Sequence, residues 1–203
     1  MRIIQSVNTI TFDAVKQAVA LLGKATFVMD RGYDENKIFL LLDHLKQDYV
    51  IRLTSKRKLL YHNKWTQATE LRNRRKGKIK ADVFFKGKEH TAYLSHVKVQ
   101  ITASRKDIYL VLVYGITEHP MMLATNKEIR SKDDVIRIAR TYFSRWRIEE
   151  YFRCKKQTRS GRKSVSAITG WRKASPAYCR MQSKASGCGS RQNVRHTVSS
   201  ALR

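Results

Sequence analysis

The sequence predicts an α/β fold followed by a long basic tail, and three observations carry this prediction. Residues 25–55 have the pattern of a strand, a helix and a second strand. Residues 81–116 contain three further β-like segments separated by turn residues. All 16 acidic residues lie at or before Glu150, so the composition changes near Gln157. We therefore expect the ordered part of the chain within residues 1–157.

The first elements are expected close to the N-terminus. The segment TFDAVKQAVALLG has apolar residues at helical spacing and ends at Gly23, a residue type common just after helices. An apolar strand is expected at 25–29, a second helix at 34–47 and a second strand at 48–55. Two strands joined by a helix generally run parallel with a right-handed crossover. These elements form the first part of the predicted core.

The middle of the chain is expected to be basic and rich in strands. A basic stretch at 71–80 precedes β-like segments at 81–85, 91–102 and 107–116. Turn residues between such segments favour an antiparallel meander. A final apolar piece at 120–126 leads toward the next helix.

A long helix is expected from Lys132 to at least Lys156. Ser131 and Asp134 have the spacing of a capping box, which favours a helix start at this point. On a helix that turns about 100° per residue, Glu150 lies about 80° away from Tyr142. Four other side chains fall within about 60° of arc on such a helix, and they are Tyr142, Arg145, Glu149 and Lys156.

The same helix face is apolar nearer its start, at Val135 and Ile138. Charged groups along a core-facing stripe are costly unless they bind something. Glutamate is a ligand for Mg²⁺, whereas arginine, lysine and tyrosine side chains bind phosphate oxygens. The alternative interpretation is a solvated helix with intrahelical ion pairs, such as Arg145 with Glu149.

The net charge favours a polyanion as partner. The chain carries 42 Lys and Arg against 16 Asp and Glu, a formal net charge of +26. Such an excess is typical of proteins that bind nucleic acid. The basic stretch within 71–88 lies beside Trp65, Phe84 and Phe85, as expected of a nucleic-acid contact. The alternative is a solvated hairpin edge protected by lysines. The DNA-binding candidates in this stretch are Arg72, Arg74, Arg75 and Lys76.

Two motifs resemble a known family. The spacing Y-x2-R-x3-E-x6-K within TYFSRWRIEEYFRCKKQ resembles the Y-R-E-K signature of bacterial insertion-sequence transposases of the DDE type. The segment FVMDRGYDENKIFLLL resembles that family around its middle catalytic aspartate, at Asp30. The resemblance covers roughly residues 10–157. The signature positions are Tyr142, Arg145, Glu149 and Lys156.

The resemblance implies a partial ribonuclease H-like fold and cut-and-paste DNA transposition by metal-dependent phosphoryl transfer. Asp30 and Glu149 would be catalytic carboxylates that bind Mg²⁺ or Mn²⁺ in a two-metal site. Tyr142, Arg145 and Lys156 would grip the phosphates of transposon ends. The implied partners are DNA and a second copy of the chain, as a homodimer in a synaptic complex.

The resemblance and the change in composition near Gln157 together predict a division of the chain. The expected parts are a partial core at 1–55, a β-rich insertion subdomain at 56–130, a catalytic helix at 131–157 and a basic disordered tail at 158–203. The tail has ten Lys or Arg, nine Ser and no acidic residue. Without a long apolar run or a secretory pattern, we expect a cytoplasmic, nucleoid-associated protein with no membrane partner.

The family's first catalytic aspartate has no clear counterpart. Only Asp13 precedes Asp30 among the acidic residues, and it begins a helix pattern, where acidic side chains are common. We therefore expect a truncated transposase fragment that does not cleave DNA as an isolated chain. The alternatives are a non-catalytic basic DNA-binding protein and a related nuclease on the same fold.

Overall fold

The computed structural model describes residues 7–101 and 105–159. The chain divides into two units, Met1–Glu150 and Tyr151–Arg203. The predicted tail lies outside the described residues except for Thr158 and Arg159, which continue the last helix. No helix within the described part of the chain is long and apolar enough to cross a membrane.

Helix α1 (Val7–Leu22) opens the described chain and ends where the sequence predicts. Gly23 adopts a positive φ of 70°, a conformation that glycine accepts without steric cost. Its N–H donates to the Val19 carbonyl at 2.9 Å and closes the last turn of the helix. The helix begins earlier than the TFDAV segment suggested, because Val7–Ile10 already has helical geometry.

The predicted strand–helix–strand unit is present. Met29 lies opposite Ile51 in a parallel pairing, so the predicted parallel arrangement of the two strands is confirmed. A short 3-10 turn, η1, follows the first strand and was not predicted. The elements are β1 (Thr26–Met29), η1 (Arg31–Tyr33), α2 (Asn36–His44) and β2 (Asp48–Arg52).

The middle of the chain forms the predicted antiparallel meander and two elements that the sequence did not reveal. The unpredicted elements are a β-hairpin and a short helix before the meander. The hairpin turns through His62 and Asn63, both at positive φ, rather than through a recognisable glycine turn. The elements are β3 (Lys58–Tyr61), β4 (Lys64–Gln67), α3 (Ala68–Arg74), β5 (Ile79–Phe85), β6 (Lys88–Ile101), β7 (Asp107–Tyr114) and β8 (Met121–Thr125).

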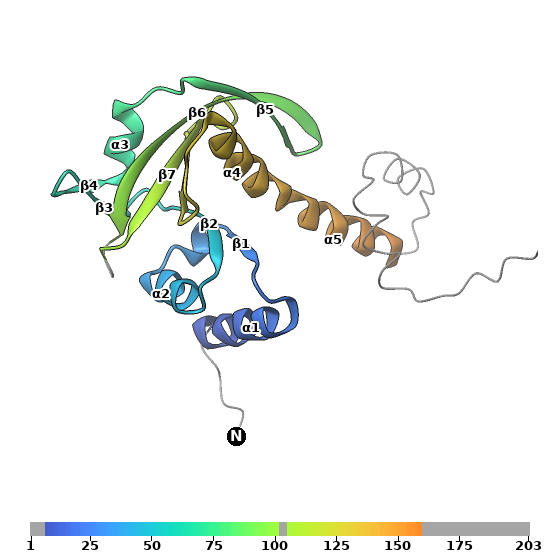
Figure 1. Cartoon of the computed structure of the whole chain (residues 1–203). Coiled ribbons are helices and arrows are strands. Elements are labelled where there is room, and N and C mark those ends of the chain that lie inside the picture. Colours follow the sequence, from blue (N-terminus) through green and yellow to red (C-terminus); the bar gives the residue numbers. More distant parts are fainter. Residues whose placement is uncertain (1–6, 102–104, 160–203) are drawn as a thin grey trace, which may run out of the picture. The chain divides into compact units, whose positions relative to one another are not determined.

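The eight strands of the described residues belong to one mixed sheet (Figure 1). Their order is β1-β2-β8-β7-β6-β3-β4, and β5 pairs with β6 outside this path. Among the strand pairs between residues 7 and 159, outside the undescribed 102–104, β1 and β2 run parallel and the other pairs are antiparallel. Strand β8, from the range predicted as an insertion, pairs directly with β2 of the predicted core. The α/β class is therefore confirmed, with one sheet that crosses the predicted boundary at residue 55.

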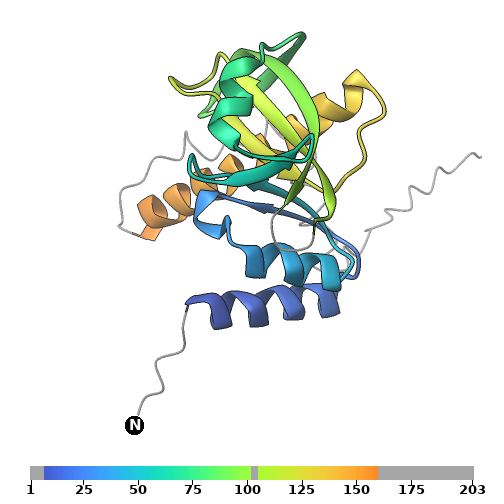
Figure 2. The ribbon, with the colours of Figure 1, turned by 90° about the vertical axis from the view of Figure 1, so that its left-hand side faces the viewer.

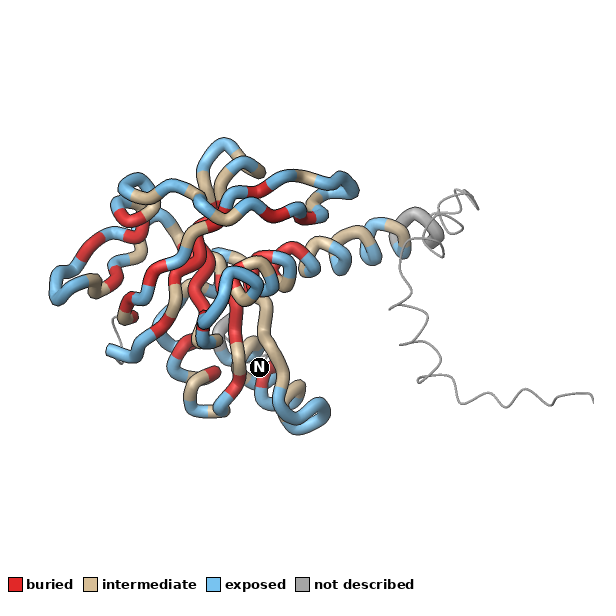
Figure 3. Tube along the Cα trace, turned by 45° about the horizontal axis from the view of Figure 1, so that its top comes forward, coloured by how far each residue is buried: buried red, intermediate tan, exposed pale blue. Residues whose placement is uncertain are grey.

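Helices cover both faces of this sheet, because its strands alternate buried side chains between two clusters. Tyr49 and Ile51 pack in a cluster with residues of α1, α2 and α3. Val50, between them, packs in the other cluster with α4 (Lys132–Ser144). Figure 2 shows α1 and α2 next to each other on one side of the strands. Figure 3 shows that many buried positions lie along the strands.

The predicted capping box at the start of α4 is present. The Ser131 hydroxyl accepts from the Asp134 N–H at 3.2 Å, and the Asp134 carboxylate accepts from the Ser131 N–H at 3.0 Å. The expectation of one uninterrupted helix is wrong at Arg145, where α4 ends and α5 (Trp146–Arg159) begins.

The physical reason for this break lies in the last turn of α4. The Ser144 hydroxyl donates to the Thr141 carbonyl at 2.7 Å, which is the acceptor that Arg145 would use in a regular helix. The Arg145 N–H donates instead to the Tyr142 carbonyl at 3.1 Å, so the chain tightens into a 3-10 type turn.

Candidate active site

Asp30 lies at the carboxyl end of β1, directly after Met29. Its Oδ1 accepts a hydrogen bond of 2.8 Å from the N–H of Arg31, so the side chain caps η1. This bond fixes the carboxylate just beyond the end of the strand. In α/β sheets the carboxyl ends of parallel strands are where ligands generally bind.

Tyr142 reaches Asp30 from the opposite part of the chain. The predicted apolar stripe of α4 is confirmed, because Val135, Ile138 and Ala139 are buried against the sheet together with Tyr142. The Tyr142 ring is buried, and its hydroxyl donates to Oδ1 of Asp30 at 3.2 Å. Packing of α4 therefore delivers one polar group to the end of β1.

Arg145 lies between two carboxylates. Its Nη2 is 3.9 Å from Oδ2 of Asp30, and its Nη1 is 2.8 Å from Oε1 of Glu149. The intrahelical pair of the alternative interpretation is thus present, but the same guanidinium also faces a carboxylate on β1. The Arg145 side chain is only 24% exposed, and its buried Nε has no hydrogen-bond partner within the described part of the chain.

Arg52 completes the cluster, although the sequence analysis did not single it out. It is the last residue of β2, and its Nη1 is 3.8 Å from Oδ1 of Asp30. The parallel register, with Met29 opposite Ile51, puts the next residue of each strand side by side. Sequence patterns do not report this register, so Arg52 could be identified only once the two strands were paired. The four charged side chains of the cluster are Asp30, Arg52, Arg145 and Glu149.

The cluster keeps Asp30 ionised. Burial acts to raise the pKa of Asp30, but the Arg31 N–H, the charges of Arg145 and Arg52 and the Tyr142 hydroxyl outweigh it, so the pKa lies below 3.8. Burial and the Asp30 charge raise the pKa of Tyr142, which stays a neutral donor. Burial opposes the charge of Arg145, yet Tyr142, Asp30 and Glu149 raise its pKa above the ordinary arginine value.

A buried ion pair anchors the loop that carries Asp30. The Asp34 side chain is fully buried and accepts hydrogen bonds from Nε of Arg57 at 2.7 Å and from the Thr54 N–H at 2.7 Å. Arg57 also donates to Oδ1 of Asn36 at 2.6 Å, and its guanidinium lies over the Phe39 ring. These contacts tie the segment after η1 to the end of β2, which carries Arg52.

The basic cluster predicted for DNA contact lies elsewhere. Helix α3 is next to β4, at the sheet edge opposite β1, so the structure does not bring this cluster to Asp30. Arg75 is engaged with the protein, because it donates to the His96 carbonyl at 3.1 Å and to the Tyr61 hydroxyl at 3.2 Å. Lys76 is exposed, and Arg74 forms only a loose, exposed pair with Glu70 at 3.7 Å.

Lys156 belongs to α5 but lies beyond Glu150, in the second unit. Its side chain is outside the described part of the structure. The structure therefore brings together three of the four signature side chains, Tyr142, Arg145 and Glu149, with Asp30.

The donor set fits a divalent cation only in part. Asp30 and Glu149 supply hard carboxylate oxygens, and both already face a cationic group, the guanidinium of Arg145. The described residues contain no group of three or more His, Cys, Asp or Glu that could hold a metal ion. Magnesium is commonly bound through one or two carboxylates together with water and substrate phosphates. The pair therefore fits a cation whose coordination a phosphate completes.

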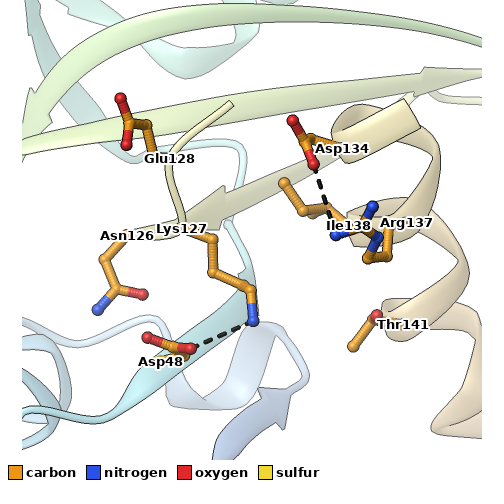
Figure 4. A pocket seen from close by; sticks show the side chains of 8 residues that line it. All are labelled: Asp48, Asn126, Lys127, Glu128, Asp134, Arg137, Ile138 and Thr141. Carbon is orange, nitrogen blue, oxygen red and sulfur yellow. Dashed lines mark hydrogen bonds and ion pairs between the residues drawn. The ribbon is translucent and has the colours of Figure 1, made fainter. Parts of the chain in front are cut away.

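A pocket of about 280 Å³ lies at the other end of β2, next to Asp48 (Figure 4). Four of its five charged side chains are paired with one another, and the fifth, Glu128, is paired with Arg130. Lys127 is 3.2 Å from Asp48, and Arg137 is 3.5 Å from Asp134. Asp134 is also occupied by the helix cap with Ser131. The Lys127–Asp48 pair joins the β8–α4 connection to the sheet, and the Arg137–Asp134 pair lies within α4, so the pocket is less suited to chemistry than the Asp30 cluster.

The chain matches the model of a known protein family. A family model described as the transposase DDE domain matches residues 5–173, which is most of the 203-residue chain. The matched range includes the whole Asp30 cluster and continues past Gln157. Among curated proteins no match is found.

Proposed function

Because the chain belongs to the transposase DDE domain family, we propose that the Asp30 cluster is this chain's part of a reaction centre for metal-dependent phosphoryl transfer on DNA. The family's first catalytic aspartate has no clear counterpart in the sequence, so in this proposal the isolated chain binds DNA and a divalent cation but does not cleave DNA. The observation that supports this most is the approach of Asp30 and Glu149, from distant parts of the sequence, to one guanidinium. The ion pair between Arg145 and Glu149 could form on a solvated helix without Asp30. The family connects the chain with DNA transposition, and the residue roles below are our proposal.

In this proposal Asp30 and Glu149 hold Mg²⁺ or Mn²⁺. Bound divalent ions activate the attacking oxygen and stabilise the leaving oxygen in phosphoryl transfer. Asp30 meets the requirement for a ligand because its lowered pKa keeps it deprotonated at neutral pH. The hydrogen bond from Tyr142 fixes the orientation of the carboxylate, and the buried ring beside it excludes water from one side.

The remaining signature residues would bind the DNA backbone. Arg145 has a planar guanidinium suited to phosphate, and its Nε is without a partner within the described residues. As the family resemblance implies, Lys156 would also bind a DNA phosphate. We also propose that paired transposon ends are held by a homodimer of this chain, as the family resemblance implies.

The basic cluster at α3 would support the duplex away from the reaction centre. Arg72, Arg74 and Lys76 are the residues proposed to contact phosphates, and such contacts carry no sequence information. Arg75 would act mainly as an anchor, since its guanidinium is bonded to the body of the protein. In this view the predicted β-rich range at 56–130 is the DNA-supporting part of the chain.

A second candidate function is a non-catalytic basic DNA-binding protein. It is favoured by one observation, that the described residues contain no cluster of three or more metal-ligand side chains. The net charge of +26 suits either function. The two candidates differ in whether the Asp30 cluster binds a divalent cation.

Affinity cleavage with iron tests the proposal. The full chain is incubated with Fe²⁺, ascorbate and peroxide, so that hydroxyl radicals cut the backbone next to the bound ion. We expect cuts near residues 30 and 149 that excess Mg²⁺ suppresses. Salt-sensitive DNA binding without such cuts would support the non-catalytic candidate and overturn the proposed reaction centre. Cuts at other positions would move the cation site away from Asp30.

A further inference from the structure

We infer that Asp34 is a positioning residue of the cation site: its buried carboxylate fixes the turn η1 and so sets where Asp30 presents its oxygens to a divalent ion. In the segment FVMDRGYDENKIFLLL the proposed function gives a role to Asp30 alone. The inference rests on the proposed function, because it takes Asp30 and Glu149 as the cation ligands.

Asp34 itself is not available as a cation ligand. Its side chain is fully buried, and both of its carboxylate oxygens already accept hydrogen bonds. Oδ1 accepts from Nε of Arg57 at 2.7 Å. Oδ2 accepts from the N–H of Thr54 at 2.7 Å and from the Thr54 hydroxyl at 2.9 Å. Any effect of Asp34 on a bound ion therefore passes through its neighbours.

The turn η1 connects Asp34 with Asp30. Asp30 caps the start of η1 by accepting from the Arg31 N–H at 2.8 Å. Asp34 closes the end of η1, where its own N–H donates to the Arg31 carbonyl at 3.3 Å. Between them the Tyr33 N–H donates to the Asp30 carbonyl at 2.9 Å. The two aspartates are thus the two ends of one bonded turn, and we expect a shift of Asp34 to move the Asp30 carboxylate.

Thr54 connects Asp34 with the end of β2. It lies two residues after Arg52, the last residue of that strand, and the N–H of Leu53 between them still bonds to β8. Asp34 thus ties the segment after β1 to the segment after β2, at the end of the sheet where Asp30 lies. A ligand group that is held in place before the ion binds binds it more tightly, because less ordering remains to be done.

The chemistry of the tie also suits a positional role. A buried ion pair is often no more stabilising than apolar side chains of similar volume. The pair of Asp34 and Arg57 adds directional bonds, because Arg57 also donates to the Asp34 carbonyl at 2.6 Å and to Oδ1 of Asn36 at 2.6 Å. Buried polar networks whose members are all bonded favour one geometry. The network therefore suits a segment that must keep a single position.

Asp34→Asn in the full chain tests the inference. The substitution keeps the size of the side chain and removes the charge that binds Arg57. Affinity for Mn²⁺ is obtained from free Mn²⁺, measured by electron paramagnetic resonance. Mn²⁺ should bind about tenfold more weakly, as for other groups that orient metal ligands. Asp43→Asn is the matched control, because Asp43 is a largely buried aspartate of α2 that pairs with Lys106 at 2.6 Å. It should bind Mn²⁺ like the wild type.

Thr54 allows a smaller change in the same contact. Thr54→Val removes the hydroxyl bond to Asp34 and keeps the buried ion pair, so Mn²⁺ binding should weaken a few-fold, as for loss of one hydrogen bond. Thr54→Ser keeps the hydroxyl and should bind Mn²⁺ like the wild type. A role of Thr54 in packing alone predicts the opposite order, because valine keeps the methyl group that serine lacks.

Thermal unfolding verifies that each variant is folded at the temperature of the titration. Should Asp34→Asn not fold, the two Thr54 variants decide the question. The inference is overturned if folded Asp34→Asn binds Mn²⁺ like the wild type, if Asp43→Asn loses as much affinity, or if Thr54→Val binds no more weakly than Thr54→Ser. A wild type that binds no Mn²⁺, or binding that Glu149→Gln leaves unchanged, would instead remove the proposed function itself.

Discussion

The Tyr142 hydroxyl donates a hydrogen bond of 3.2 Å to Oδ1 of Asp30, and so joins α4 to the end of β1. These residues are 112 positions apart in the sequence. The bond connects the apolar stripe that packs α4 on the sheet with the carboxylate at the centre of the proposed site. Packing of the core and geometry of the site therefore depend on each other.

Tyr142→Phe removes this bond and leaves the ring in place. The free energy of unfolding should fall by about 0.5–1.5 kcal/mol, the usual net value of one hydrogen bond. The pKa of Asp30 should rise, because the hydroxyl is one of the groups that lower it. Urea denaturation and a carboxyl titration by NMR measure the two effects. Tyr93→Phe, on an exposed position of β6, is the control and should leave the Asp30 pKa unchanged.

The lowered pKa of Asp30 predicts a dependence of stability on acid. A carboxyl group whose pKa is lower in the folded chain adds stability above its unfolded pKa, near 3.8, and loses it as the pH falls through the folded pKa. The difference in unfolding free energy between wild type and Asp30→Asn should therefore be constant from pH 5 to 7. Below about pH 3.8 the wild type should lose stability relative to Asp30→Asn. A difference that does not change in acid would contradict the lowered pKa.

The buried pair of Asp34 and Arg57 should be far more important for stability than a surface pair. Arg57→Ala leaves a fully buried carboxylate without its cation and should cost about 3–5 kcal/mol. The control is Arg130→Ala, which breaks an exposed pair with Glu128 and should leave the free energy of unfolding almost unchanged. Urea denaturation measures both. Similar losses in the two variants would mean that solvent reaches Asp34.

The basic surface at α3 should determine how DNA binding depends on salt. Replacing Arg72, Arg74 and Lys76 by Gln should reduce the slope of log K against log salt by about 0.9 for each phosphate that the protein no longer neutralises. Fluorescence anisotropy at several salt concentrations gives the slope. Replacing Lys16, Lys37 and Lys46, which are exposed on and after α1 and α2, removes the same charge. An equal reduction in this control would indicate that net charge, not this surface, governs binding.

Local signals in the sequence were sufficient for much of the fold. Gly23, the capping box at Ser131 and the alternation of the β5–β7 segments each act within a few residues, and each prediction is confirmed. The β3–β4 hairpin and α3 were missed. Their turn uses His62 and Asn63 in a left-handed conformation, and the basic residues of α3 concealed its buried Ala68 and Leu71.

The site could be anticipated only in part, for a similar reason. Helical spacing grouped Tyr142, Arg145 and Glu149, and the break at Arg145 did not separate them from Asp30. Arg52 and the Asp34–Arg57 pair depend on strand register and on loop contacts between distant residues. No periodicity reports such contacts. Register becomes known only once the strands are paired.

The central claim is that Asp30 and Glu149 form a cation-binding pair. Substitution of each of two neighbouring glutamates, Glu149 and Glu150, tests it most directly. Mn²⁺ affinity of the full chain is compared among wild type, Glu149→Gln and Glu150→Gln. Glu149 faces Arg145 at 2.8 Å, whereas Glu150 lies near Gly87 on the β5–β6 turn. We predict that Glu149→Gln weakens binding by about tenfold or more, as for loss of a metal-site group, and that Glu150→Gln binds like the wild type. Equal affinities in all three proteins, or a greater loss in Glu150→Gln, would contradict the claim.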